Sequence, residues 1–212
     1  MRFVFCEQKN NADGEMVRYT NNTVTSVTRW TVDTSKVTDM SCAFQDARAL
    51  KSIDLSNFDT SAVTDMHYMF SVCPVLSSLD VSNFNTSNVT DMISMFNGCK
   101  NLPALNLSNF NTSKVTNMRS MFYSCSKLTA LDVSNFNTSK VTKMVSMFST
   151  CRNLASLNLS KFDMSKVTDT SGMFEYDEKL KTVYIDKEDE KLLAVLPGGV
   201  WTYFGGAYHL VT

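Results

Sequence analysis

The sequence predicts an α/β repeat solenoid. About six stacked turns of 26 residues would each hold one short parallel strand and one short helix or helical turn, with a cap at either end. One observation behind this prediction is a phrase at 108–125 that returns almost unchanged at 134–151. Another is a change of apolar spacing within each copy, from alternation to a helical pattern. A stack needs the same side chains at every level, whereas a unique active site needs them once.

Four columns of apolar residues repeat at this interval without insertions. One copy alone cannot bury enough apolar surface to offset the ordering of its chain. We therefore expect the turns to cover one another and to join through a parallel backbone ladder about 4.8 Å apart. The columns are Phe44, Phe70, Phe96, Phe122, Phe148 and Phe174; Leu50, Leu76, Leu102, Leu128, Leu154 and Leu180; Val37, Val63, Val89, Val115, Val141 and Val167; and Met40, Met66, Met92, Met118 and Met144.

The composition is that of a globular protein without marked charge. Of 212 residues, 43% are hydrophobic and 19% charged, and the formal net charge is -1. We therefore expect neither nucleic acid nor an anionic membrane as a partner. Seven glycines and three prolines argue against a flexible linker and favour one structural domain. The sequence has no transmembrane run or signal-peptide core, so we expect no direct membrane insertion, and the chain as given could equally be a piece of a longer protein.

The strand of each turn is predicted from alternation. In "LPALNLSNF", Leu105 and Leu107 flank Asn106, so the leucines face the interior and the Asn faces outward. One interpretation of the outward residues is a polar strip that binds sugar hydroxyls or a cation. The interpretation that we favour is a structural ladder, in which amides bond along the stack and Asn spares most turns a like-charged neighbour. This strand-face file consists of Asp54, Asp80, Asn106, Asp132 and Asn158.

A second asparagine file follows the strands. We expect it to be structural, because the residue scarcely changes from one copy to the next. It consists of Asn57, Asn83, Asn109 and Asn135.

The helical part of each turn is predicted from "VTNMRSMFYSC". Met118, Met121, Phe122 and Cys125 have helical spacing, and Thr116 stands where an N-cap residue is expected. We interpret the whole threonine column in this way rather than as an ice-binding array, since lysines two residues away would spoil such a face. The connecting "NTSKV" carries side chains that can bond the backbone where the chain turns.

The two ends of the chain depart from the repeat. We predict an N-terminal cap at 1–29, formed by a hairpin over the first turn, and six repeats at 30–185. An aromatic-rich C-terminal cap is predicted at 186–212, with a helical stretch around 186–196. Both caps would shield a terminal turn that otherwise exposes an apolar slab.

The unit "MFSVCPVLSSLDVSNFNTSNVTDM" at 69–92 resembles the bacterial surface-protein 26-residue repeat, a family related to the BspA-like leucine-rich repeat proteins. The resemblance covers roughly residues 30 to 185. It implies a leucine-rich-repeat-like, right-handed stack without catalytic residues. It also implies an extracellular or cell-surface location, where such a protein meets hosts, matrices or other cells.

A cysteine column ends each helical segment. It contains no C-x-x-C pair, and a 26-residue period lays thiols in a row instead of around a point, so we expect no metal site. Disulfides between adjacent turns are geometrically conceivable. We favour buried thiols that act as small apolar residues, because the corresponding Ala47 and Asp177 are not cysteine. The column consists of Cys73, Cys99, Cys125 and Cys151.

Variation between copies marks surface that packing does not constrain. The most variable columns belong to the helical side and the loop after it, which makes this variable face a candidate partner-binding surface, although neutral drift gives the same pattern. The candidate residues are His67, Ile93, Arg119, Val145, Asn97, Tyr123, Lys100 and Arg152.

The C-terminal aromatics Trp201, Tyr203, Phe204 and Tyr208 could stack on a carbohydrate or a partner, but we expect them to pack the cap onto the last turn. Enzyme motifs are absent. The two histidines lie in no metal motif or nucleophile constellation, and the glycine-rich end has no phosphate-binding pattern. We expect no catalytic residue, no cofactor and no metal.

The leading hypothesis is a monomeric, non-enzymatic module that binds a protein or glycan at a bacterial cell surface or in a matrix, for adhesion or another interaction. Its contacts would be modest and spread over several turns. The alternative is a structural spacer or array unit without a specific ligand. A cryptic hydrolase would require a pocket in which His67 or His209 meets a carboxylate.

Overall fold

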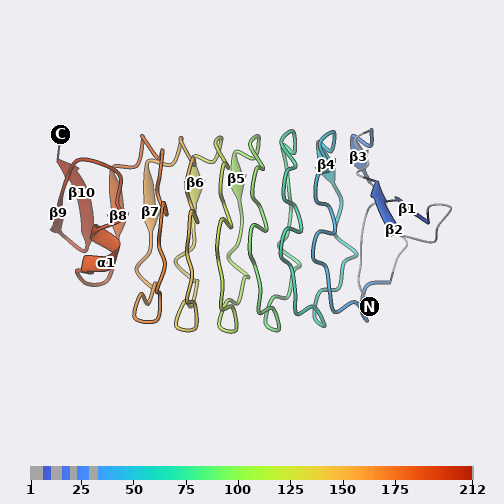
Figure 1. Cartoon of the computed structure of the whole chain (residues 1–212), viewed down its shortest axis with the longest axis horizontal. Helices are drawn as coiled ribbons and strands as arrows, with labels where there is room; N and C mark the ends of the chain where they lie inside the picture. Colours follow the sequence, from blue (N-terminus) through green and yellow to red (C-terminus); the bar gives the residue numbers. More distant parts are fainter. Residues whose placement is uncertain (1–6, 11–15, 20–22, 29–32, 212) are drawn as a thin grey trace.

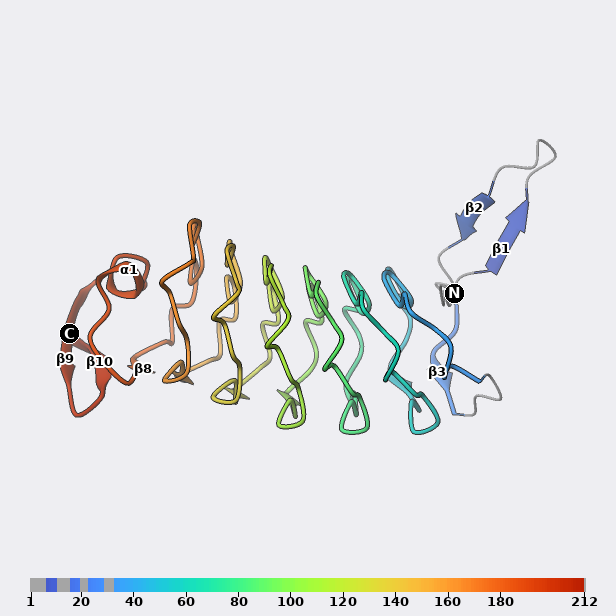
Figure 2. The ribbon, with the colours of Figure 1, turned by 90° about the horizontal axis from the view of Figure 1, so that it is seen from below.

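The computed structural model describes residues 7–10, 16–19, 23–28 and 33–211. Turns of similar outline follow one another in a nearly straight row (Figures 1 and 2). The short parallel strands occupy one side of this row, from β3 at the N-terminal end to β8 at the C-terminal end. The stacking expected from the sequence is therefore present for the short parallel strands, which form repeated small sheets.

The parallel strands pair as the repeat requires. Each pair joins residues that are 26 positions apart in the sequence, such as Leu105 with Leu131. The strands are short because the alternation lasts for only a few residues before the Asx and Ser side chains turn the chain. The pairs are β3 (Ser26–Val27) with β4 (Ser52–Ile53), β5 (Ala104–Leu105) with β6 (Ala130–Leu131), and β7 (Ser156–Asn158) with β8 (Thr182–Tyr184).

The apolar columns form continuous files through a shared interior. The side chains of Phe70, Phe96 and Phe122 are fully buried. Along the whole phenylalanine file, neighbouring ring centroids lie 5.3 to 5.9 Å apart and the rings are inclined by only 2° to 9°. The interior is thus a stack of like side chains, as predicted.

The predicted helix of each turn is wrong. In its place the chain makes consecutive turns, because two residues of each copy have a left-handed backbone, for example Ser94 (φ 53°) and Gly98 (φ 73°). The N–H groups of Ser94, Phe96 and Gly98 donate to carbonyls of the next turn at 2.8 to 3.0 Å. Those of Met95 and Asn97 donate to the third residue before them. Successive N–H groups therefore alternate between bonding the next copy of the repeat and closing the local turn.

The spacing of the stack explains why no helix forms here. An α-helix with its side chains is about 10–12 Å wide. Adjacent phenylalanine rings are less than 6 Å apart, so the solenoid advances by less than one helix diameter per turn. A second parallel ladder takes the place where the helix was expected to begin. It links Asp39, Asp65, Asp91, Asn117, Lys143 and Asp169, each bridged to the next.

Buried threonines join the turns at a corner where no strand ladder runs. The Thr86 hydroxyl donates to the carbonyl of Asn111 at 3.1 Å and accepts from the N–H of the same residue at 2.8 Å. Thr112 does the same for Asn137. One side chain thus satisfies two backbone groups of the following turn, which would otherwise be partly buried without partners. The bridging residues are Thr34, Thr60, Thr86, Thr112 and Thr138.

The second asparagine file also ties the turns together. The Asn109 amide donates to the carbonyls of Val81 at 3.2 Å and Phe84 at 2.6 Å, both in the preceding turn. Asn83 and Asn135 make the corresponding bonds one turn earlier and one turn later. These residues have the structural role that was expected of them.

The C-terminal end closes the stack by changing from parallel to antiparallel pairing. The strand β10 (Ala207–Val211) pairs antiparallel with β8 and with β9 (Val200–Phe204), which gives the sheet order β7-β8-β10-β9. The buried Tyr208 hydroxyl accepts from the N–H of Asp189 and donates to its carbonyl, both at 2.9 Å. Tyr208 thereby repeats the bridge that threonine makes in the preceding turns.

The helical stretch expected around 186–196 is much shorter. The helix α1 spans Glu190–Leu193, and the Asp189 carboxylate caps it by accepting from the N–H of Leu192 at 3.0 Å. At the other end, β1 (Glu7–Asn10) and β2 (Met16–Tyr19) form an antiparallel pair. Other parts of the predicted cap at 1–29, including 1–6 and 11–15, lie outside the described residues, and its capping role stays a prediction.

Candidate functional site

The strand-face file lies on the outer surface of the sheet. Four of its five members are exposed and Asn158 is half-buried. These side chains do not bond along the stack as expected. Instead, each Oδ1 accepts from the backbone N–H two residues further on, as in Asp132 to Ser134 at 2.9 Å and Asn158 to Ser160 at 3.0 Å. Each side chain is thus held by its own turn.

These hydrogen bonds also keep the carboxylates ionised. The Ser134 hydroxyl and then the Ser134 N–H stabilise the charged form and lower the pKa of Asp132 below its ordinary value. Ser82 lowers the pKa of Asp80 in the same way. The file therefore presents fixed acceptors to solvent at neutral pH.

The file continues beyond the repeats into the C-terminal sheet. Asn158 pairs with Tyr184, Tyr184 with Ala207, and Ala207 with Phe204. Directly paired residues point to the same face of a sheet, so the strip of Asp and Asn side chains leads to two aromatic rings. Tyr184 is 46% exposed and Phe204 60% exposed, while the small Ala207 between them is buried.

The C-terminal aromatics thus divide between two faces. Tyr208 is buried, and Tyr203 and Trp201 pack against the core, as predicted for a cap. Phe204 instead points outward, where its ring stacks on His209 with centroids 4.1 Å apart. The prediction that all four aromatics pack inward is wrong for Phe204, because the alternation of β9 places it on the opposite face from Trp201 and Tyr203.

A shallow hollow lies where the polar and aromatic parts of this face meet. Its volume is about 250 Å³. Asp132, Asn158 and Tyr184 line it together with the small residues Ala130 and Ser156. Sequence reasoning missed Tyr184, although its position was visible: it stands in register where the earlier copies have Asp or Asn.

The variable face follows the consecutive turns instead of a helix. Arg119, Tyr123, Lys100 and Arg152 are exposed, and the other four candidates are half-buried. His67 is held by Asp65, with 2.6 Å between Nδ1 of the imidazole and Oδ1 of the carboxylate. The eight residues come from neighbouring columns of the stack, but whether they bind a partner stays a prediction.

The threonine column does not cap helices. The Thr90 N–H and hydroxyl both donate to the carbonyl of Thr64 in the preceding turn, at 2.9 and 3.2 Å. Thr116 and Thr142 continue the series. The N-cap interpretation is wrong because no helix follows these residues.

The cysteine column is buried, and the five described cysteines are free. The Cys99 thiol donates to the carbonyl of Phe70 at 3.2 Å and Cys125 to that of Phe96 at 3.1 Å. Burial raises the pKa of both thiols well above the ordinary value, which suppresses the reactive thiolate. These thiols pack as small apolar residues.

Asp177 occupies the position that follows Cys151 in this column. It is only 2% exposed, and its Oδ1 accepts from the Cys151 N–H at 2.7 Å. Burial raises its pKa to about 7. A hollow of about 480 Å³ lies beside it, lined also by Leu180, Pro197 and Leu210. Asp177 is therefore a titratable group at the junction of the last turn and the cap.

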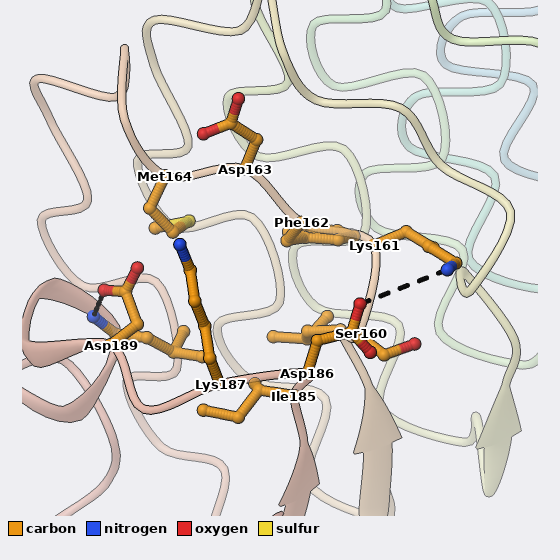
Figure 3. Close-up of a pocket in the computed structure, with 11 residues that line it drawn as sticks. Ser160, Lys161, Phe162, Asp163, Met164, Ile185, Asp186, Lys187 and Asp189 are labelled. Atoms are coloured by element: carbon orange, nitrogen blue, oxygen red, sulfur yellow. Dashed lines mark hydrogen bonds and ion pairs between the residues drawn. The ribbon is translucent and has the colours of Figure 1, made fainter. Parts of the chain in front are cut away.

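Another hollow opens where the chain leaves the repeat (Figure 3). Its volume is about 430 Å³, and its lining includes Phe162, Met164, Ile185 and Lys187. Met164 stands in the column of bridging threonines and cannot make their bond, so the segments 159–164 and 185–189 lack that bridge here. An exposed ion pair between Lys161 and Asp186, 4.0 Å apart, joins the two segments instead. Figure 3 shows Lys187 extending between the segments toward Met164.

The family comparison covers most of the chain. A model described as "Mycoplasma protein of unknown function, DUF285" matches residues 14–105 and again 99–187. The chain belongs to the DUF285 family. None of the curated proteins matches it. Among solved structures, a leucine-rich repeat protein from Bacteroides ovatus ATCC 8483 is similar, with 13% sequence identity and a TM-score of 0.28. The alignment covers 80% of this chain and 65% of that protein.

The two DUF285 matches meet within the array, at 99–105, in agreement with a chain built from like copies. Among the described residues of this DUF285 protein, no group of three His, Cys, Asp or Glu side chains could hold a metal ion. The described part also contains no helix long and apolar enough to cross a bilayer. What the described part of the chain offers to a ligand includes two extended surfaces and the hollows at Tyr184, Asp177 and Met164.

Proposed function

We propose that this DUF285 chain is a non-enzymatic interaction module that binds a protein or a glycan through its extended surface. The observation that carries the proposal is that the columns of the repeat differ in role, some holding the fold together and others facing solvent. Residues that recur in every copy are buried, or are bonded either between turns or within their own turn, whereas exposed positions such as Arg119, Tyr123 and Lys100 differ from copy to copy. A rigid scaffold with a varied surface suits recognition.

Among the described residues, the cysteine and histidine side chains that could act in catalysis are buried or lie outside the hollows. The cysteine thiols are buried with raised pKa values. His67 does contact the carboxylate of Asp65, but neither His67 nor His209 lines any of the three hollows described above. The family match names no catalytic activity. These facts support the non-enzymatic part of the proposal.

The location and the winding belong to the proposal as well. A surface or secreted protein that meets a host, a matrix or another cell is what the sequence resemblance implies, and so is right-handed, leucine-rich-repeat-like winding. Because every turn offers similar area, we expect many modest contacts and not one dominant residue.

A structural spacer remains the second candidate. It is favoured by the uniform stacking, in which five successive ring pairs differ by only 0.6 Å in separation, from 5.3 to 5.9 Å. Such a straight rod would serve reach and stiffness without a ligand.

A binding screen separates these candidates. The folded protein would be tested by biolayer interferometry against matrix proteins and a panel of glycans. The matched control replaces Arg119, Tyr123 and Lys100 together with alanine, which changes the variable face without touching the buried columns. Binding that the triple variant weakens supports a module that uses this face. Failure of the wild-type protein to bind anything in either panel would favour the spacer.

A further inference from the structure

We infer that the outer face of β6, β7, β8, β10 and β9 is a binding site for an uncharged glycan, in which Tyr184 stacks on a sugar ring beside Asp132, Ser156 and Asn158. The inference rests on the proposed function, since it assumes that the chain acts by binding. It goes further by naming the ligand class and a surface separate from the variable face.

The register of the sheet places these groups on one face. Asp132 bridges Asn158, and Asn158 pairs with Tyr184. Ser156 lies two residues before Asn158 on the same strand, so its side chain points the same way. The hollow of about 250 Å³ confirms that these residues surround one depression in the surface.

Two aromatic rings on this face are exposed to solvent, which suits the binding of a sugar ring better than packing of the fold. Tyr184 and Phe204 leave 46% and 60% of their surface in solvent, although neighbouring aromatics such as Tyr208 are buried. Ala130 beside the hollow and Ala207 between the rings have small side chains, so no bulky group rises from the surface next to the rings. An exposed ring beside a low surface can receive the apolar C–H face of a pyranose, which needs a flat partner with little to lose in flexibility.

The polar groups are fixed and retain hydrogen-bonding capacity. The backbone N–H of Ser134 donates to the Asp132 side chain, and that of Ser160 donates to the Asn158 side chain, so both side chains are held in place. A carboxylate has about four acceptor sites, and the Ser134 N–H occupies one of them at Oδ1 of Asp132. Within the described part of the chain, the Asn158 amide N–H groups have no hydrogen-bond partner. An acceptor and a donor held side by side match a pair of sugar hydroxyls, and their preorganisation lowers the cost of binding.

The charge of the site selects the class of glycan. Asp132 is the one ionised group among the residues that line the hollow, and it remains ionised at neutral pH. A negative charge in the site disfavours sulfated or uronic-acid polymers and favours neutral ones. The absence of a deep apolar pocket at this face argues against a protein side chain as the anchor.

Affinity electrophoresis tests the inference directly. The intact chain is run through native gels that contain a neutral polysaccharide (mannan, galactomannan, xylan or mixed-linkage β-glucan), or an anionic one (polygalacturonate). We expect retardation by at least one neutral polymer and none by polygalacturonate. Replacement of Tyr184 by alanine should weaken the interaction roughly tenfold to thirtyfold, while Tyr184→Phe should retain most of it.

An exposed tyrosine that belongs to neither candidate surface provides a matched control. Tyr176 is 59% exposed and lies in a turn outside this sheet, so Tyr176→Ala should bind the neutral polymer like the wild-type chain. Because Tyr184 and Tyr176 are both exposed, neither change should unfold the protein, which circular dichroism would verify. Asn158→Ala tests the polar part and should weaken binding without abolishing retardation.

The outcomes separate this inference from the proposed function. Equal loss of glycan binding in the Tyr176 and Tyr184 variants, or unchanged binding after Tyr184→Ala, would overturn the site. No neutral polymer retarding the wild-type chain would overturn it too, while protein binding at the variable face would leave the proposed function standing. Retardation only by polygalacturonate would refute the ligand class.

Discussion

Replacement of Asp177 by asparagine should stabilise the protein at neutral and alkaline pH. Asparagine has the shape of the protonated carboxyl group and keeps the Oδ1 acceptor for the Cys151 N–H, which now lies at 2.7 Å. What it removes is the need to bury a negative charge at a site that is 2% exposed. The change therefore isolates the electrostatic cost of this one group.

The magnitude follows from the pKa. Burial raises it from 3.8 to about 7 in the folded protein, so the folded state holds a proton that the unfolded state has already released. The free energy of unfolding then falls as pH rises from about 4 to about 7. Since one pKa unit corresponds to about 1.4 kcal/mol, Asp177 costs about 4 kcal/mol above pH 7. The asparagine variant should recover most of this.

The assay is urea unfolding of both proteins at several pH values between 4 and 8.5, followed by circular dichroism. The two unfolding curves should nearly coincide at pH 4, and the variant should gain stability progressively toward pH 8. Asp80→Asn is the control, because the pKa of exposed Asp80 is lowered by hydrogen bonds from Ser82 and its change can give no such gain. A constant difference between wild type and Asp177→Asn across the whole range would refute the reasoning.

Three further changes test the contacts between turns by the same unfolding assay. Thr112→Val should cost about 1–3 kcal/mol, because the N–H and carbonyl of Asn137 lose their bridge, and Thr112→Ser should restore most of it. Tyr208→Phe should cost about 1–2 kcal/mol and speed hydrogen exchange at Asp189 specifically; unchanged exchange there would contradict the bridge. Phe122→Ala should cost about 3–5 kcal/mol, and a value below 1 kcal/mol would contradict the stacked interior.

The repeat period and the interior were predictable because they depend on identity between copies. A column such as Phe96 and Phe122 can be buried at every level only if the turns lie directly on one another. The strands were predictable for a related reason, since Leu105, Asn106 and Leu107 show the alternation of a half-buried strand. Backbone pairing then follows from the stacking.

The helix was predicted wrongly because consecutive turns can also bring inward side chains together at spacings of three and four. Met118, Met121 and Phe122 are all fully buried without being helical. The information against a helix lay in the residues between them. Ser120 and Ser124 have positive φ angles, and a backbone in this conformation ends a helix. A serine in the sequence does not by itself indicate a positive φ angle.

The role of the polar columns was harder to predict than their position. Asp132 and Asn158 were placed correctly on the strand face, yet their bonds go to their own turns and not along the stack. Both choices satisfy an Asx side chain, and the decision depends on loop geometry that the residue types leave open. The threonines were misjudged for the same reason, because Thr90 bonds a carbonyl of the preceding turn where a helix cap was expected.

The candidate sites at the C-terminal end share one physical cause, which is replacement of a repeat residue in its own column. Met164 takes the place of a bridging threonine, and a hollow opens where the bridge is lost. Asp177 takes the place of a cysteine, and a titratable group enters the interior. Tyr184 takes the place of Asp or Asn, and a ring faces solvent beside the polar file. Residues that conform to the repeat are constrained by stacking, so the local surface and interior change most where a residue breaks its column.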